Sequence, residues 1–390
     1  MGKIALGILS VILLLASCAG KTAISENATE ESVNEITQPD LEDNSINIAI
    51  QEAVPLIIGG RQYRGRLGEW VTYPHEWGST RKLPGESVNC TVDDIDKLFI
   101  VGLWVDPENP ERMKSLENLE LLQNIKELTI RGRNLDKVDF SPVSLLPNLE
   151  ILEIEGNIVR LPDLTRLDRL NKIVIKNSAL ESLEGIGAPY VKTIKVEAAN
   201  GNIDSLAPLN NLLVLEYLYI ICPLDKMMKI ADMANLPELT FFIFEGSEID
   251  IRGIENLASL ETLHLLDCRP LNIEGIGRLN NLKILELNLI SDNPSIDFLR
   301  GMPAIEYLYI FGHFRGKNNR HQEIEAYQVL NASPLATIRT MDLLYFENLI
   351  IRNISALDVL ERLITIRLEK SRLYDESEKT RHGLIFEIIH

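Results

Sequence analysis

Apolar residues recur along this chain at two alternating spacings. One is L-x-x-L-x-L, with Ile, Val or Phe in place of some Leu residues, and the alternation at its end predicts a short strand. Successive copies start about 21 to 25 residues apart over most of the chain, a period that indicates stacked structural repeats. We expect units to open at Ile95, Ile125, Leu149, Leu170, Val191, Leu215, Leu239, Leu260, Leu282, Ile305, Ile338 and Leu363.

The second spacing places an apolar residue at every third position between the strands. Leu161, Leu164 and Leu167 lead into Leu170 in this way, and the same period recurs in other units. A period of three aligns side chains along one edge of a 3₁₀ or short helical turn. Each unit is therefore predicted to run from strand through turn to a short helical return. Because no unit can bury its apolar side alone, stacking is expected to create one continuous core.

These two half-patterns resemble the short-repeat, internalin-like class of leucine-rich-repeat proteins over roughly Ile95 to Leu368. The resemblance implies an α/β solenoid, a leucine-rich-repeat horseshoe with a parallel concave β-sheet and a short 3₁₀ or helical convex side. That class often carries Asn at the ninth position of the unit, where the amide satisfies the turn backbone. Asn157 fits, but Ser178 and Cys268 are among the residues that replace it elsewhere. We therefore expect an interrupted asparagine ladder.

The start of the chain resembles the signal peptide of a bacterial lipoprotein. Lys3 precedes the apolar run 4–15, which is too short for a stable membrane span. The run ends in Leu15-Ala16-Ser17-Cys18, which is similar to a lipobox. This similarity implies that residues 1–17 are removed and that Cys18 is the lipid-anchor residue. Ordinary secretory cleavage after Ala19, which would discard Cys18, is the alternative.

The remaining segments have distinct compositions. Residues 18–50 are acidic and polar, with almost no aromatic residue, so they cannot bury enough apolar surface to offset their ordering entropy and predict a flexible tether. Trp70 and Trp77 fall in a segment without repeats; we interpret them as the core of a cap, the alternative being that they stack on a ligand. We expect an N-terminal cap over 51–94, about 12 repeats over 95–370 with an insertion at 312–334 that includes a helix near 322–330, and a C-terminal cap over 371–390. A lipid-anchored protein of this kind would lie in the bacterial cell envelope, at the outer membrane or cell surface.

The charge and the motifs argue against several function classes. A net charge of −18 disfavours nucleic acid as a partner, because neutralising phosphates requires an excess of Lys and Arg. The sequence contains no G-x-S-x-G, P-loop, H-E-x-x-H or C-x-x-C motif, so we expect neither an enzyme nor a cofactor. Cys90, Cys222 and Cys268 lack metal-ligand spacing, and His313 and His321 are interpreted as surface residues; we expect no metal. A hydrolase assembled across repeats remains an alternative.

Outward positions on the predicted strands form a map of the sheet surface. Alternate residues of a strand point to opposite faces, and equivalent positions in adjacent units become neighbours. Arg131, Glu155, Lys176 and Glu197 occupy one outward row with alternating sign, which predicts a ladder of mutually paired charges.

The next outward positions are aromatic or apolar instead. Contiguous exposed apolar patches mark interaction sites, and Tyr is enriched at binding hot spots. The alternatives are that bulky residues simply suit sheets, or that the insertion covers them. A structural envelope protein without a specific partner is the other functional hypothesis. We predict a protein partner that binds at Tyr217, Tyr219, Phe241, Ile243, His264, Leu266, Tyr307, Tyr309 and Phe311.

Overall fold

The chain divides into two units, Met1–Gln51 and Glu52–His390, and the second contains every element described below. The first unit, with the expected signal peptide, Cys18 and the whole predicted tether, lies outside the described residues. The computed structural model describes residues 55–65, 88–203, 205–210, 212–222, 226–233, 235–246, 248–289, 294–312, 328–374 and 385–389, the last segment without its side chains.

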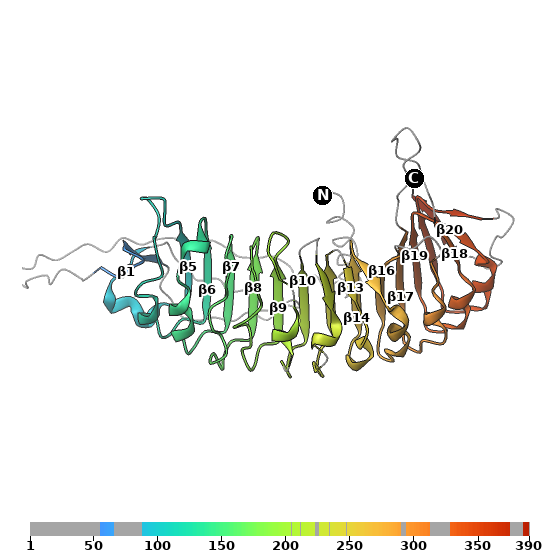
Figure 1. Cartoon of the computed structure of the whole chain (residues 1–390), viewed down its shortest axis with the longest axis horizontal. Coiled ribbons are helices and arrows are strands. Elements are labelled where there is room, and N and C mark those ends of the chain that lie inside the picture. Colours follow the sequence, from blue (N-terminus) through green and yellow to red (C-terminus); the bar gives the residue numbers. More distant parts are fainter. Residues whose placement is uncertain are drawn as a thin grey trace, which may run out of the picture. The chain divides into compact units, whose positions relative to one another are not determined.

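A single long sheet of 13 parallel strands runs through the second unit, with its strands in chain order (Figure 1). Each strand of a predicted repeat forms from the alternating half of that repeat, as the spacing of the apolar residues predicts. The strands are β5 (Ile100–Val105), β6 (Glu127–Gly132), β7 (Ile151–Glu155), β8 (Lys172–Lys176), β9 (Thr193–Glu197), β10 (Tyr217–Ile221), β12 (Phe241–Glu245), β14 (Thr262–Leu266), β16 (Ile284–Leu289), β17 (Tyr307–Gly312), β19 (Leu343–Glu347), β21 (Thr365–Glu369) and β23 (Ile385–Ile389).

The returns between these strands contain short 3₁₀ helices, and the described residues include no α-helix. The helices are η1 (Val92–Lys97), η2 (Leu119–Leu121), η3 (Leu135–Lys137), η4 (Ser141–Leu145), η5 (Ala207–Leu209), η6 (Ile230–Met233), η7 (Ile254–Asn256), η8 (Ile273–Arg278), η9 (Asp297–Leu299), η10 (Ser333–Thr337) and η11 (Ile354–Val359). The returns between β7 and β8 and between β8 and β9, which are described throughout, contain no helix, so the predicted helical return is wrong for these two units.

Some turns also carry a strand that pairs with its equivalent in the next unit. Two small parallel sheets arise in this way, and two antiparallel pairs precede the first repeat. The parallel sheets join β11 (Met227–Lys229), β13 (Glu248–Asp250) and β15 (Arg269–Leu271), and then β18 (Gln328–Asn331), β20 (Leu349–Arg352) and β22 (Arg372–Leu373); the antiparallel pairs are β1 (Ile57–Ile58) with β2 (Arg61–Gln62), and β3 (Arg64–Gly65) with β4 (Val88–Asn89).

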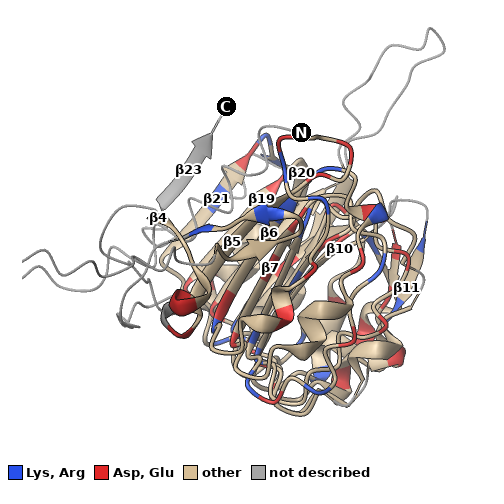
Figure 2. Cartoon of the chain, turned by 90° about the vertical axis from the view of Figure 1, so that its left-hand side faces the viewer, with Lys and Arg blue, Asp and Glu red and all other residues tan. Residues whose placement is uncertain are grey.

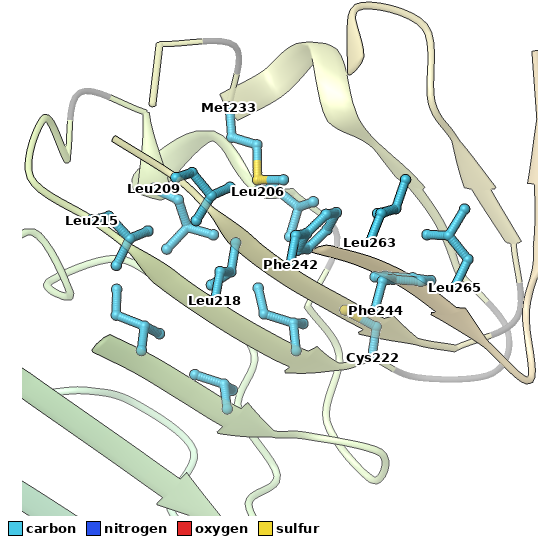
Figure 3. Close-up of a cluster of buried hydrophobic side chains, with 14 of the residues drawn as sticks. Leu206, Leu209, Leu215, Leu218, Cys222, Met233, Phe242, Phe244, Leu263 and Leu265 are labelled. Atoms are coloured by element: carbon cyan, nitrogen blue, oxygen red, sulfur yellow. The ribbon is translucent and has the colours of Figure 1, made fainter. Parts of the chain in front are cut away.

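The core is one continuous stack of the two predicted half-patterns. Consensus strand residues such as Leu218, Phe242 and Leu263 are fully buried, and so are Leu206 and Leu209 from a return. Figure 3 shows strand residues of neighbouring units packed against one another and against the returns. Both the short strand and the period-three return are thereby confirmed, because each contributes one side of the same core.

The first repeat has a different register from the predicted one. Val101 pairs with Leu128, and Leu103 pairs with Ile130. The residue equivalent to Ile125 is then Leu98, so the unit opens three residues later than the predicted Ile95.

The eleventh repeat shows the same error. Leu344 lies opposite Leu308, and Phe346 lies opposite Ile310, so this unit opens at Met341 instead of Ile338. The physical reason is common to both units. The period-three return adds an apolar residue three positions before the true opening. The L-x-x-L-x-L pattern therefore also fits when it is placed three residues too early.

The C-terminal segment adds strands to two sheets of the repeat. Residues 371–390 were predicted as a C-terminal cap whose last residues form a final strand or cap; within them, β22 extends a small sheet and β23 extends the long one. The helix expected near 322–330 is wrong for its described residues, because Gln328–Asn331 is strand β18. In the N-terminal segment, Leu56 and Ile58 are buried against the first repeats, while Trp70 and Trp77 lie outside the described residues.

Asparagine stabilises the turns at two different positions of the repeat. Asn157 accepts a hydrogen bond from the backbone N–H of Leu135 at 2.9 Å, in the turn of the preceding unit, whereas the family resemblance implied a contact with the next unit. At Ser178, which replaces it in the next unit, the hydroxyl donates to the carbonyl of Glu197 at 2.8 Å. The ladder is therefore interrupted as predicted, but the turn backbone still receives a side-chain hydrogen bond.

The second asparagine position precedes a 3₁₀ helix and was not predicted. Asn134, Asn272 and Asn353 adopt left-handed φ values of 53°, 60° and 57°, a conformation that Asn tolerates better than most residues. Their side-chain amides donate to the preceding unit, to Asp106, Asp250 and Asn331 respectively, at 2.9 to 3.0 Å. Each turn is thus hydrogen-bonded to the turn before it.

Among the described residues, no helix has the length and apolar character needed to cross a membrane.

Leu263 provides a test of the core register. It is fully buried, so Leu263→Ala should lower the free energy of unfolding by about 2 to 5 kcal/mol through lost contacts and a cavity. Chemical denaturation measures this loss. The matched control is Leu145→Ala, because Leu145 is 58% exposed and should lose about 0.5 kcal/mol or less. Equal losses in the two variants would contradict the register.

Candidate functional site

The long sheet brings the predicted partner-binding residues together on its outward face. Tyr217, Tyr219 and Ile221 are half-buried, whereas Leu218 and Ile220 between them are fully buried. Strand β17 alternates in the same way. On β12 and β14 the register with β10 still places Ile243 and His264 in the outward row of Tyr219, but some outward residues there are buried as well. The residues come from β10, β12, β14 and β17, and β16 lies between the last two.

Two of the predicted residues form a covered floor. Ile243 is only 8% exposed and Leu266 only 5%, although both occupy outward positions. Ile243 lies between its register partners Tyr219 and His264 on the adjacent strands. Neighbouring side chains on the same face therefore shield much of this apolar surface from water.

The aromatic rings pack against one another along the sheet. Tyr217 and Phe241 stack with ring centroids 4.6 Å apart and an interplanar angle of 13°. On the next strand, the His264 ring lies 5.7 Å from Phe241. Phe241 therefore has a ring neighbour on each side, and an approaching ligand would meet ring edges instead of an open ring face.

A tyrosine that the sequence analysis missed extends this surface to β19. Tyr345 is the register partner of Tyr309, and its ring lies 5.9 Å from Tyr309 and 5.5 Å from Phe311. Tyr345 was missed because the eleventh repeat was predicted to open at Ile338, and that register does not place Tyr345 in an outward row. We call the predicted residues together with Tyr345 the aromatic patch.

Trp104 was missed for the same reason, because the first repeat was predicted to open at Ile95 instead of Leu98. It is 49% exposed on β5, in the outward row that continues into Arg131. The guanidinium of Arg112 lies 4.8 Å from the centre of its ring, a cation–π contact. Trp104 is several strands away from the aromatic patch and is not part of it.

Carboxylates lie close to the hydroxyls of two tyrosines of the patch, Tyr345 and Tyr219. The Tyr345 hydroxyl lies 2.7 Å from Glu369 and 3.1 Å from Glu347, and it has a single proton to donate. Burial raises the pKa of Tyr345, and the hydrogen bond to Glu369 raises it further. Burial also raises the pKa of Tyr219, with the charge of Glu245 as the next cause. These phenols therefore stay neutral well above physiological pH.

A polar contact crosses the middle of the patch. His264 Nδ1 hydrogen-bonds to the carboxylate of Glu286, its register partner on the next strand. Both side chains are largely covered, with exposed fractions of 13% and 14%. This pair separates the aromatic residues of β10 and β12 from those of β17 and β19.

The charged half of the sheet, on β6 to β9, is largely paired within itself. Arg131 lies 3.0 Å from Glu155, and Lys176 lies 2.8 Å from Glu153, while Lys195 pairs with Glu197 at 2.9 Å. The predicted pairing of Arg131 with Glu155 is confirmed; Lys176 instead pairs diagonally with Glu153. Figure 2, viewed from the end of the chain that carries β5, shows basic and acidic residues intermixed among the described elements.

A separate hollow of about 610 Å³ lies beside the return between β7 and β8. Leu135, Phe140 and Ile158 contribute apolar walls, and Asp136 and Arg160 contribute charge. None of these residues belongs to the outward face of the sheet, so this hollow is distinct from the aromatic patch.

Comparison with known proteins identifies the fold. No family model matches the chain. An internalin from Listeria monocytogenes matches at a TM-score of 0.51 with 17% sequence identity, over 77% of this chain and 89% of the internalin. The fold is a leucine-rich-repeat solenoid. A leucine-rich-repeat protein from Leptospira interrogans also matches, with a TM-score of 0.36 and 13% identity, over 76% of this chain and 97% of that protein.

A curated relative shares the repeat at the level of sequence. Leucine-rich repeat-containing protein 23 from Bos taurus is 24% identical over 203 residues, which are 50% of this chain. The match spans 58% of the bovine protein, less than two thirds of its length. The similarity supports the leucine-rich-repeat character of the chain.

Tyr309 allows a test of the buried phenols by pH. Burial raises its pKa from 10.0 to about 12, so above pH 10 the unfolded chain loses this proton before the folded chain does. The contribution of Tyr309 to stability should be complete below pH 10 and fall as the pH rises towards 12. Tyr309→Phe should keep the ring packing and lose less stability over this window, as followed by denaturation at stepped pH. Parallel loss in both proteins would show that Tyr309 is exposed.

Proposed function

We propose that this chain is a membrane-anchored leucine-rich-repeat protein that binds a protein partner through the aromatic patch. The observation that carries the proposal is the set of aromatic and apolar side chains on the outward face of β10 to β19, which lies on both sides of the pair His264–Glu286. Solenoids of this class commonly use such extended surfaces for protein interaction. A patch of this kind, with several tyrosines, has the composition of a binding hot spot.

The internal packing of the patch favours a protein as the partner. Tyr217 and Phe241 stack on each other, so they do not offer open ring faces to a flat ligand such as a sugar ring. They offer ring edges above the apolar floor of Ile243 and Leu266, next to tyrosine hydroxyls and carboxylates. Apolar area bordered by polar groups is the usual arrangement of protein interfaces.

The charged half of the sheet has no comparable role in this proposal. Glu153 lies beside both Lys176 and Arg131, so a partner would have to break existing pairs to use these charges. Exposed pairs of this kind contribute little free energy. The binding energy is therefore assigned to the aromatic patch.

The anchoring part of the proposal rests on the sequence. The apolar run 4–15 ends at Leu15-Ala16-Ser17-Cys18, and an acidic polar segment follows. An acylated Cys18 would hold the protein at a membrane of the bacterial cell envelope, and residues 18–50 would separate the repeats from the lipid surface. One acyl chain alone would bind only weakly, so stable anchoring requires more than one.

The binding proposal predicts the effect of two tyrosine substitutions. Tyr219 and Tyr309 lie four strands apart, about 20 Å at the usual strand spacing and within the span of a standard interface. Tyr219→Ala with Tyr309→Ala should weaken binding of the captured partner by about 2 kcal/mol or more. Quantitative pull-down of envelope proteins identifies the partner, and calorimetry measures the affinity.

Lys176→Gln is the control for this experiment, because it removes an existing ion pair on the charged half and should change the affinity little. Unchanged binding in the double tyrosine variant would place the interface elsewhere. An intact chain that captures no partner at all would favour a structural role in the envelope.

The anchoring proposal predicts the behaviour of a second variant. In detergent phase separation, the intact protein should enter the detergent phase, whereas Cys18→Ser should remain in the aqueous phase because it cannot be acylated. Mass spectrometry of the mature N-terminus gives an independent reading. An unmodified N-terminus at Gly20 would show secretory cleavage after Ala19 in place of lipidation.

A further inference from the structure

Two carboxylates lie at the ends of neighbouring strands, beside the apolar floor of the aromatic patch. Glu245 is the last residue of β12, and its register partner on β14 is Leu266. Asp267 follows directly and has a left-handed φ of 45°. Ile243 lies two residues before Glu245 on the same face. The arrangement is an apolar strip that ends in negative charge.

The negative charge at this place is not balanced by a described neighbour. Among the described residues, no ion pair includes Glu245 or Asp267, whereas the nearby Glu197 pairs with Lys195 at 2.9 Å. Burial raises the pKa of Glu245, and the charges of Asp267 and Glu197 raise it further, while the hydrogen bond from Tyr219 opposes the rise. Glu245 is therefore held beside like charges, which a positive group would relieve.

We infer that the protein partner places the charged end of a Lys or Arg side chain between Glu245 and Asp267, beside the covered floor of Ile243 and Leu266. The inference rests on the proposed function, since it names the chemistry that the partner brings to the aromatic patch. Lys and Arg bury their aliphatic stems along apolar surface and keep their charged ends among polar groups.

The charge of the chain is consistent with this partner. A net charge of −18 attracts a basic segment over a long range and raises its association rate. The charged half offers a contrast, because Glu155 already lies 3.0 Å from Arg131. A basic side chain gains more at Glu245 and Asp267, where it displaces no existing pair of the described residues.

A phage-displayed library of random 15-residue peptides, selected on the full-length chain in detergent, provides the test. Selected peptides should contain Lys or Arg next to an apolar residue. The combined change Glu245→Gln and Asp267→Asn should lower the affinity of a selected peptide about tenfold or more, because it removes both charges and keeps the side-chain shapes. Glu155→Gln is the matched control and should change the affinity less than about twofold. Thermal unfolding of each variant reports whether the fold is intact.

Two further readings complete the test. Replacing the basic residue of the peptide by Gln should reproduce the loss on the intact chain and have little effect on the double variant. Added salt should weaken binding to the intact chain more than binding to the double variant, because salt screens the charge attraction.

The outcomes separate this inference from the proposed function. If Tyr219→Ala abolishes peptide binding but the carboxylate changes do not, the cationic contact is overturned and the aromatic patch remains the interface. If neither set of changes matters, or no peptide is enriched over the double variant, both ideas fail. The predicted insertion 312–334 contains three basic residues, Arg315, Lys317 and Arg320. If binding emerges only when these three residues are replaced by Gln, the positive group comes from this chain, and a partner's cation is overturned.

Discussion

Burial of the consensus apolar side chains between neighbouring units is the interaction on which the rest of the structure depends. A single strand and its return leave most of their Leu and Ile surface exposed, so each unit is stable only between two others. Parallel pairing at about 4.8 Å places equivalent residues next to each other. A shift of one residue would turn Leu263 and its equivalents towards water, so the core permits a single register. The outward rows are aligned as a consequence.

The same backbone arrangement supports two chemically different surfaces. On the charged half, Arg131 and Lys176 are neutralised by glutamates of the same face. On β10 to β19 the outward side chains are aromatic and pack on one another, as Tyr217 does on Phe241. Because neighbouring rings and hydrogen bonds such as that from Tyr345 to Glu369 restrict these side chains before any ligand arrives, less entropy would be lost on binding. The aromatic patch is thus organised in advance.

Most residues of the candidate site were predicted from the sequence, but Tyr345 at its edge was missed. Outward residues such as Tyr219 and Phe311 follow from strand alternation once the register of their units is known. Tyr345 was missed because the return before β19 continues the apolar spacing and allows two registers. The proximity of Glu245, Asp267 and Tyr219 was also not predicted. It depends on where two strands end relative to each other, which the spacing within one unit does not specify.

The sequence by itself determined the class of fold, the strand and return in each unit, and the side of the sheet that most residues face. These properties follow from apolar periods of two and three, which act within a few residues. The tertiary structure alone decided the register of the first and eleventh units, the contacts of Asn134, Asn272 and Asn353 with the preceding turn, and the carboxylates that meet each tyrosine. Those contacts join different units, so they depend on how the whole core packs. Where a return offers one more apolar residue at the right spacing, only the packed neighbours decide which residue points inward.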